Sequence, residues 1–310
     1  MKHVDTNQTR AALPFDKLIP ALRGAFEAGA TVPLRHNHAI RSQGVDGTSL
    51  IMPAWSEQGY FGVKLVNIFP GNGGKGLPGL HSSYILHDAT TGVPLALIDG
   101  NEITSRRTAA ASALAVDYLA RRDATRLLLV GAGRVAAMVP EAFRTVRDIS
   151  HVTVWNPTPA RAEALVATLK QAGFDAERTD NLEQATRQAD IISCATLSEA
   201  PLIRGDWLQP GVHLDLIGSF APIMKEADPA CFIGHEVFVD TDEASMKAGE
   251  LLDAFATGAF SKDNILANLE DLCRGRHSGR SDAQAITVFK AVGTALEDLA
   301  AATLVYHNAG

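Results

Sequence analysis

The sequence lacks the features that mark secreted, zinc-binding or membrane-spanning proteins. Its three cysteines, Cys194, Cys231 and Cys273, are widely spaced and form no Cys-x-x-Cys pair, which favours reduced thiols over disulfides or a metal site. No apolar run reaches the roughly 18 residues that a membrane span needs. Residues 1–16 contain no continuous apolar segment behind a positive charge. These absences predict a cytoplasmic protein without a membrane partner.

Positive charge is also scarce. Lysine and arginine number 28 against 35 aspartates and glutamates, so the formal net charge is −7. This balance argues against a nucleic-acid partner or an anionic membrane surface. The 310 residues, of which 46% are hydrophobic and 20% charged, suffice for two domains that each have a core.

The most informative stretch is residues 127–136, which read LLLVGAGRVA. Its unbroken apolar start predicts a parallel strand buried on both faces. In the GxGxxA turn that follows, the first glycine permits a tight reversal, the second lets a pyrophosphate approach the backbone, and Ala136 allows close packing of a helix. The positive end of that helix favours phosphate, so we predict a Rossmann fold. The residues expected at the pyrophosphate are Gly131, Gly133, Arg134 and Val135.

A second strand, residues 151–155, is followed by Asn156 at the position that reads the ribose. NAD enzymes usually have Asp or Glu there, which repels a 2′-phosphate. The neutral Asn156, together with Thr158 and Arg161, favours NADPH, although NADH is possible. A solvated charge on the next helix is the alternative for Arg161.

The α/β alternation continues with helices expected at 160–172 and 182–188 and strands at 190–196, 212–219 and 236–240. Ligands in open α/β sheets bind outside the carboxyl ends of the strands. We therefore expect Thr196, Gly218 and Ser219 to line the cofactor crevice, with simple turn formation as the alternative.

Apolar residues recur at helical spacing over residues 282–306, which predicts one long amphipathic helix. We expect it to return to the first domain, which would make that domain discontinuous. Lys290, within it, either reaches the cofactor or is solvated.

The first hundred residues predict a mixed α+β region. A helix is expected near 16–28, strands at 49–54 and 59–67, and a hairpin from 83–87 and 93–98. The glycine-rich residues 70–79 lack a Gly-Lys-Ser/Thr sequence, so we expect a mobile loop beside a site and not a phosphate loop.

The Ala-rich residues 104–120 predict a helix with Arg106 and Arg107 in its first turn. A cation is unfavourable at that end of a helix. We therefore expect Arg107 to bind the carboxylate or phosphate of a ligand, unless the two arginines face solvent or pair with Asp99 or Glu102.

Six stretches together resemble the ornithine cyclodeaminase/mu-crystallin family over nearly the whole chain. They are VPLR (32–35), GVKLV (62–66), DGNEITSRRTAA (99–110), GAGRVA (131–136), VWN (154–156) and TVFK (287–290). The resemblance implies a homodimer whose first domain, residues 1–117 and 283–310, binds substrate and forms the interface, while residues 118–282 bind NAD(P)H. It implies that Arg35, Lys64 and Arg107 hold a carboxylate. It also implies that Thr108 lies at the cofactor and that His81 or Ser219 relays a proton.

The chain departs from the cyclodeaminases of this family in the loop after residue 217. Cyclodeaminases and related alanine dehydrogenases have an acidic residue where this chain has Phe220, which cannot transfer a proton. Residues 33–38 resemble bacterial members that reduce pyrroline-2-carboxylate, including those of hydroxyproline degradation.

The resemblance therefore predicts a ketimine reductase, in which NAD(P)H donates hydride to a cyclic imine. The expected reaction converts Δ1-pyrroline-2-carboxylate to L-proline, or Δ1-piperideine-2-carboxylate to L-pipecolate. The alternatives are cyclodeamination, reductive amination of a 2-keto acid, and a non-catalytic NADPH-binding protein similar to a lens crystallin.

Overall fold

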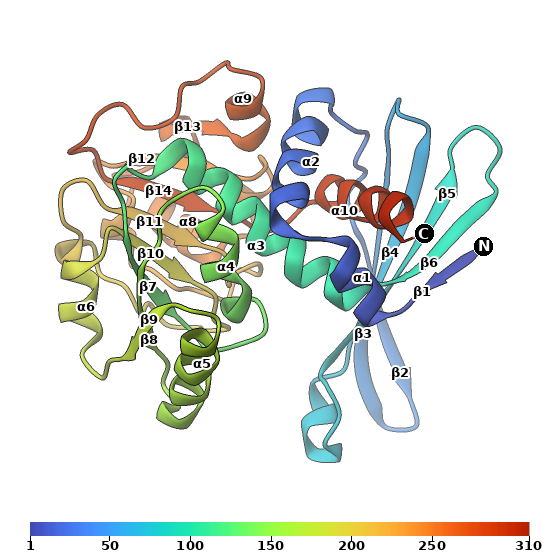
Figure 1. The fold of residues 1–310 in the computed structure, drawn as a ribbon, viewed down its shortest axis with the longest axis horizontal. Coiled ribbons are helices and arrows are strands. Elements are labelled where there is room, and N and C mark those ends of the chain that lie inside the picture. Colours follow the sequence, from blue (N-terminus) through green and yellow to red (C-terminus); the bar gives the residue numbers. More distant parts are fainter. Residues whose placement is uncertain (310) are drawn as a thin grey trace. The chain divides into compact units, whose positions relative to one another are not determined.

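A computed structural model describes residues 1–309 and divides into two compact units (Figure 1). Unit 1 comprises Met1–Arg107 and Thr294–Gly310, and unit 2 comprises Thr108–Gly293. The assignment of substrate binding and dimerisation to residues 1–117 and 283–310, and of cofactor binding to 118–282, stays a prediction.

Unit 1 is built on a six-stranded sheet with the order β1-β6-β5-β4-β3-β2. β1 runs parallel to β6, and every other neighbouring pair is antiparallel. The strands are β1 (Lys2–Val4), β2 (His36–Ser42), β3 (Val45–Trp55), β4 (Tyr60–Ile68), β5 (Leu80–Asp88) and β6 (Pro94–Asp99). The hairpin and both strands expected in this region are confirmed.

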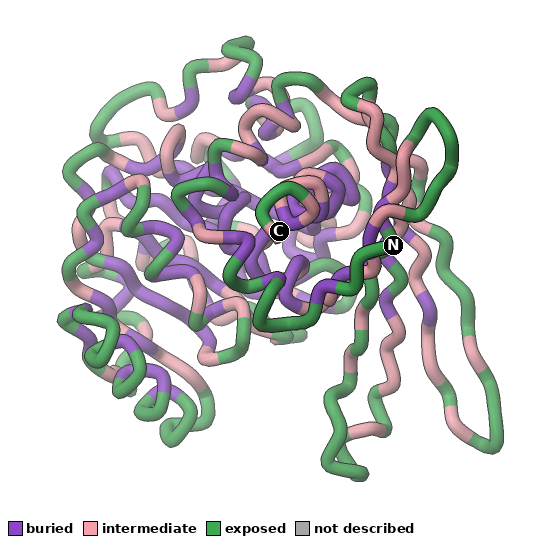
Figure 2. Tube along the Cα trace, turned by 45° about the vertical axis from the view of Figure 1, so that its right-hand side comes forward, coloured by how far each residue is buried: buried purple, intermediate pink, exposed green. Residues whose placement is uncertain are grey.

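One face of this sheet is covered by helix α10 (Ala295–Asn308), which packs on β3 to β6. α2 (Phe15–Ala28) packs on α10 although it comes from the other end of the chain (Figure 1). α2 buries apolar side chains at helical spacing, among them Leu18, Leu22 and Phe26. Along the sheet, burial alternates with the period of a strand. Figure 2 shows half-buried and exposed residues along the strands.

Unit 2 contains an eight-stranded, all-parallel sheet with the order β13-β12-β14-β11-β10-β7-β8-β9. Its strands are β7 (Arg126–Val130), β8 (His151–Trp155), β9 (Asp175–Arg178), β10 (Ile191–Cys194), β11 (His213–Leu216), β12 (Glu236–Val239), β13 (Ile265–Asn268) and β14 (Thr287–Lys290). The strand order reverses between β7 and β10. Such a reversal opens a crevice at the carboxyl ends of the strands, and the predicted Rossmann fold is confirmed.

Short helices connect these strands. The other α-helices of residues 1–309 are α1 (Thr6–Ala12), α3 (Gly100–Leu119), α4 (Val139–Arg144), α5 (Pro159–Gln171), α6 (Leu182–Gln188), α7 (Ala244–Lys247), α8 (Gly249–Ala256) and α9 (Leu269–Cys273). Among residues 1–309, no helix is both long and apolar enough to cross a membrane.

The prediction of one helix over residues 282–306 is wrong. Thr287–Lys290 forms β14, a fully buried strand between β11 and β12, and α10 begins only at Ala295, after its N-cap Thr294. Gly293 adopts a positive φ of 78° between the two elements, a conformation that ends regular structure. A short apolar run has the same spacing in a buried strand and in a helix, which explains the error.

The predicted start of the helix at residue 104 is also wrong. α3 begins at Gly100, where the Asp99 carboxylate accepts a hydrogen bond from the Glu102 amide at 2.7 Å. Arg106 and Arg107 consequently lie beyond the first turn. The helix dipole therefore does not require Arg107 to bind a ligand anion.

Candidate functional site

Lys64 lies in the middle of a row of residues that crosses the sheet of unit 1. The strand register pairs Met52 with Lys64, Lys64 with Tyr84, and Tyr84 with Ile98. Residues directly opposite each other in a sheet share one face, here the face beneath α10. Arg35 is half-buried and directly precedes β2. The next residue, His36, is the first of β2 and pairs with Ile51 of β3.

Lys64 is buried and paired with a carboxylate on α10. Its Nζ lies 2.6 Å from Asp298 Oδ2 and 3.4 Å from Thr104 Oγ1. Burial lowers the pKa of Lys64 to about 8, although the negative charge of Asp298 opposes this shift. Lys64 is thus a cation at neutral pH that is poised to titrate under mildly alkaline conditions.

Arg107 is buried beside the same carboxylate. Its Nε donates to Asp298 Oδ1 at 2.9 Å, and its Nη1 donates to Glu297 Oε2 at 2.6 Å. Burial alone would raise the pKa of Asp298, but Arg107 and Lys64 hold it below its usual range. The anions beside Arg107 are therefore two carboxylates of the protein itself.

These four side chains form a compact group of two cations and two anions, which we call the cation cluster: Lys64, Arg107, Glu297 and Asp298. Glu297 and Asp298 lie in the first turn of α10, where the helix dipole stabilises negative charge. An arginine can hold a ligand carboxylate with two parallel hydrogen bonds. A ligand carboxylate that binds here must share the two cations with Asp298 and Glu297.

Sequence reasoning missed both acidic members of the cluster. The available signal was a Thr-x-x-Glu-Asp pattern, because a capping threonine followed by acidic residues marks the start of a helix. Their assignment to a helix expected to begin at residue 282 hid this pattern.

His81 is not brought to the cation cluster. It is exposed on β5 and pairs with Asn67, three residues before Tyr84. Since side chains alternate between faces along a strand, His81 faces away from Lys64. Its role as a proton relay stays a prediction.

In unit 2 the glycine turn has the geometry that a dinucleotide needs. Gly131 has a φ of 117°, its amide donates to Trp155 O at 2.8 Å, and a Cβ there would lie 2.7 Å from Ala195 O. A Cβ on Gly133 would meet nothing within 4 Å, so open space lies where a pyrophosphate would approach. Arg134 is exposed and Val135 half-buried before a 3-10 turn at Ala136–Met138 leads into α4.

The residues expected at the ribose lie at the start of α5. Asn156 Nδ2 donates to Thr158 O at 3.0 Å, and Thr158 is the N-cap of α5 without a side-chain capping bond. The exposed Arg161 and Ala132 of the glycine turn line the same hollow of 340 Å³. The structure therefore brings Arg161 and the glycine turn to one cavity.

The loops after β10 and β11 are joined by a residue that sequence reasoning missed. The Glu226 carboxylate accepts hydrogen bonds from Thr196 N at 2.6 Å, Thr196 Oγ1 at 2.8 Å and Gly218 N at 2.8 Å. Burial raises the pKa of Glu226 to about 7, and Lys290 and the bonds from Thr196 oppose this shift. The expected crevice residues Thr196 and Gly218 are thus held together by one buried carboxylate.

Ser219 and Lys290 are fully buried and both contact Glu250. The Ser219 hydroxyl donates to a Glu250 carboxylate oxygen and also lies 3.0 Å from Met224 O. Lys290 Nζ lies 2.8 Å from Glu250 Oε1. Both side chains point into the protein here, and their cofactor roles stay predictions. Thr108, the first residue of unit 2, is half-buried on α3, and its cofactor role likewise stays a prediction.

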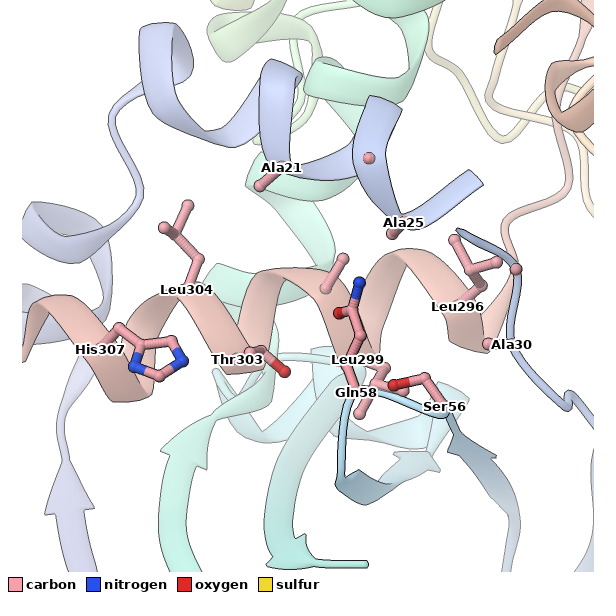
Figure 3. A pocket seen from close by; sticks show the side chains of 13 residues that line it. Ala21, Ala25, Ala30, Ser56, Gln58, Leu296, Leu299, Thr303, Leu304 and His307 are labelled. Atoms are coloured by element: carbon pink, nitrogen blue, oxygen red, sulfur yellow. The ribbon is translucent and has the colours of Figure 1, made fainter. Parts of the chain in front are cut away.

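A separate cavity of 250 Å³ lies between α2 and α10 in unit 1 (Figure 3). Small and apolar residues line most of it, and none of the expected site residues does. At one end His307 Nε2 lies 3.1 Å from the Tyr60 hydroxyl. This cavity lacks the paired cations that a carboxylate needs. Within residues 1–309, no group of three His, Cys, Asp or Glu side chains is arranged to hold a metal ion.

Comparison with known proteins gives a consistent result. The model of the ornithine cyclodeaminase/mu-crystallin family matches residues 4–310. Protein SAR DEFICIENT 4 of Arabidopsis thaliana is 42% identical, with 90% of this chain and 87% of that protein covered. The Δ1-pyrroline-2-carboxylate reductase of Colwellia psychrerythraea is 37% identical, with 97% of each covered.

Among solved structures, the Δ1-pyrroline-2-carboxylate reductase of Thermococcus litoralis in complex with NADH and L-proline superposes with a TM-score of 0.93 at 31% identity. The match covers 100% of this chain and 97% of that one. The chain therefore belongs to the ornithine cyclodeaminase/mu-crystallin family.

Proposed function

We propose that this NAD(P)H-dependent oxidoreductase reduces the C=N bond of a cyclic 2-carboxylate, converting Δ1-pyrroline-2-carboxylate to L-proline. The observation that carries the proposal is the buried pair Lys64 and Arg107, joined by Asp298. Two cations in a dry environment suit a small carboxylate. A relative at 37% identity is named for this reaction, and the similar structure from T. litoralis holds NADH and L-proline.

The reaction needs few groups from the protein. NAD(P)H would supply the hydride that the imine carbon accepts, and the electrons of the C=N π bond would then move to nitrogen. An imine that binds protonated becomes the secondary amine without a further proton donor. Lys64 and Arg107 would hold the substrate carboxylate and so fix the orientation of the imine carbon.

The loop after β11 supports reduction over deamination. Phe220 is 40% exposed at the position where the resemblance implies an acid in cyclodeaminases and alanine dehydrogenases. A phenyl ring cannot remove or deliver a proton at a reacting nitrogen. Reduction of a preformed imine avoids that requirement. The six-membered Δ1-piperideine-2-carboxylate is a second candidate substrate.

We further propose that NADPH is the preferred cofactor and NADH the alternative. Asn156 leaves the ribose position without a carboxylate, and Arg161 lies at the same hollow as the glycine turn. An uncharged residue with a nearby arginine accommodates a 2′-phosphate. The T. litoralis structure holds NADH, so NADH is measured beside NADPH.

A homodimer is proposed on the character of the sheet in unit 1. The face opposite α10 carries neighbouring apolar residues, in which Val63 pairs with Ile85 and Ile85 with Leu97. Leu65 and Ile85 are each 38% exposed, and Trp55 is 41% exposed. Apolar patches of this kind mark association surfaces. The cytoplasmic location and the link to hydroxyproline degradation stay predictions.

The test is the loss of NADPH absorbance with purified protein and Δ1-pyrroline-2-carboxylate. Parallel reactions contain NADH, the six-membered imine, or pyruvate with ammonia, and a separate assay measures ammonia release from ornithine. Oxidation that depends on the cyclic imine supports the proposal. Oxidation only with pyruvate and ammonia, or ammonia release from ornithine, would replace it with a rival reaction. Cofactor binding without any turnover would indicate a binding protein.

A further inference from the structure

Glu226 lies at the carboxyl edge of the parallel sheet, where its carboxylate contacts the loops after β10 and β11. It follows β11 in sequence, yet its carboxylate accepts bonds from loops after two different strands. Oε1 takes the amide and hydroxyl of Thr196, and Oε2 takes the amide of Gly218. Its own carbonyl oxygen accepts from the amides of Leu202 and Ile203, each at 2.9 Å. One residue therefore ties together the two loops that border the predicted cofactor crevice.

The close fit around Gly218 shows that the carboxylate is built into this edge. A Cβ at Gly218 would lie 2.2 Å from Thr196 O and 2.3 Å from Glu226 Oε1. Any larger residue would push the two loops apart. The glycine is needed for this close approach of backbone and carboxylate, a role separate from simple turn formation.

We propose that Glu226 is a positioning residue for the nicotinamide cofactor, because its carboxylate sets the spacing of the loops after β10 and β11. This inference rests on the proposed binding of NAD(P)H and adds a residue that does not itself touch the cofactor. In open α/β sheets the dinucleotide lies against the ends of these strands. A change in the spacing of these two loops should therefore lower the affinity for the cofactor.

The surroundings of Glu226 make its ionised form the one that holds the loops. Three donors point at its two oxygens, and protonation would remove the negative charge that strengthens these bonds. The titratable groups that face it are Lys290 on β14, Glu250 on α8 and Cys194 on β10. Burial keeps the pKa of Cys194 well above its usual value, so that thiol stays neutral while Glu226, with a pKa of about 7, titrates.

Glu226→Gln provides the direct test, with Asp215→Asn as its matched control. Glutamine has nearly the shape of glutamate but presents an NH2 group to one of the three donors. Asp215, on β11, is equally buried, but its carboxylate accepts the hydroxyls of Ser112 and Ser193, at 2.5 and 2.6 Å. It shares the burial of Glu226 without contacting either loop amide.

The measurement is the Kd of NADH from its fluorescence at pH 8 and pH 6, with thermal unfolding of each variant. NADH is chosen because the 2′-phosphate of NADPH would itself titrate near pH 6. In the parent protein, protonation of one group with a pKa near 7 should raise the Kd about tenfold from pH 8 to pH 6. Asp215→Asn should keep that pH dependence, whereas Glu226→Gln should bind about tenfold more weakly at pH 8 and show no pH dependence.

Thr196→Val keeps the test decisive where Glu226→Gln does not fold. It removes only the hydroxyl bond to Glu226 and should raise the Kd about threefold at pH 8. Parent-like affinity and pH dependence in a folded Glu226→Gln protein would overturn the inference while the proposed function stands. Binding of NADH without imine reduction would remove the proposed substrate and leave this inference intact. If the parent protein does not bind NADH, both the proposed function and the role of Glu226 are contradicted.

Discussion

Asp298 on α10 lies 2.6 Å from Lys64 on β4 and connects it to Arg107 through its second oxygen. The pairing joins residues far apart in the sequence and compensates the charges of two buried cations. A buried cation without a partner would be strongly destabilising. Under the proposed function, we expect a substrate carboxylate to take over part of this compensation.

Two replacements of Arg107 should separate its effect on stability from its effect on kcat/KM. Arg107→Ala leaves Glu297 and Asp298 with less compensation, and loss of one partner of a buried pair costs about 3–5 kcal/mol in stability. Arg107→Lys keeps the charge but loses the two-pronged geometry, so kcat/KM should fall about 100-fold, or about 2.7 kcal/mol, with a smaller change in Tm. Steady-state kinetics and thermal unfolding measure the two effects.

Arg106→Lys is the control for Arg107→Lys. Arg106 is equally buried on α3, but its Nε donates to Leu13 O at 2.7 Å, outside the cation cluster. This variant should keep its kcat/KM. A folded Arg107→Lys enzyme with parental kcat/KM would remove Arg107 from the substrate site.

Substrate binding should weaken as the pH rises through about 8. The charged form of Lys64 attracts the carboxylate, and its pKa is lowered to about 8, so kcat/KM should fall up to tenfold per pH unit above that value. Lys64→Arg stays charged and should lack this alkaline decline. Since Asp298 raises the pKa of Lys64, Asp298→Asn should move the decline to lower pH. An alkaline profile unchanged in Lys64→Arg would assign the titration to another group.

Cofactor preference should depend on the charge at Asn156. Asn156→Asp places a carboxylate near the expected 2′-phosphate and should raise the Kd of NADPH about tenfold or more with little change for NADH. Arg161→Ala should act in the same direction through loss of a cation. Fluorescence titration with both cofactors gives the ratio. Equal effects of Asn156→Asp on NADPH and NADH would place the phosphate elsewhere.

The apolar face of the unit 1 sheet should control association. Leu65→Asp puts a charge in the centre of this face and should convert a dimer to monomers in sedimentation experiments. Leu266→Asp is the control, because Leu266 is 46% exposed on β13 of unit 2. A Leu65→Asp protein that remains dimeric would move the interface to another surface.

The sequence alone predicts the Rossmann core because its signals are local. The run at 127–130, the glycine turn and Asn156 lie within thirty residues, and each depends on backbone geometry or burial that neighbouring residues reveal. The same reasoning fails at residues 287–290, where an apolar run is compatible with a strand or a helix. Only its place between β11 and β12 decides in favour of a strand.

The candidate site likewise contains residues that the sequence indicates and residues that only the tertiary structure reveals. The family resemblance marked Lys64 and, together with its place in a helix, Arg107, while strand ends marked Thr196 and Gly218. Their partners Asp298, Glu297 and Glu226 were decided by the tertiary structure, because a carboxylate on one element can reach a cation or an amide on another only after the chain has folded. The sequence by itself therefore determined the type of fold and the class of cofactor. The tertiary structure decided which charges meet, since electrostatic pairing depends on distances of a few ångströms between residues remote in the chain.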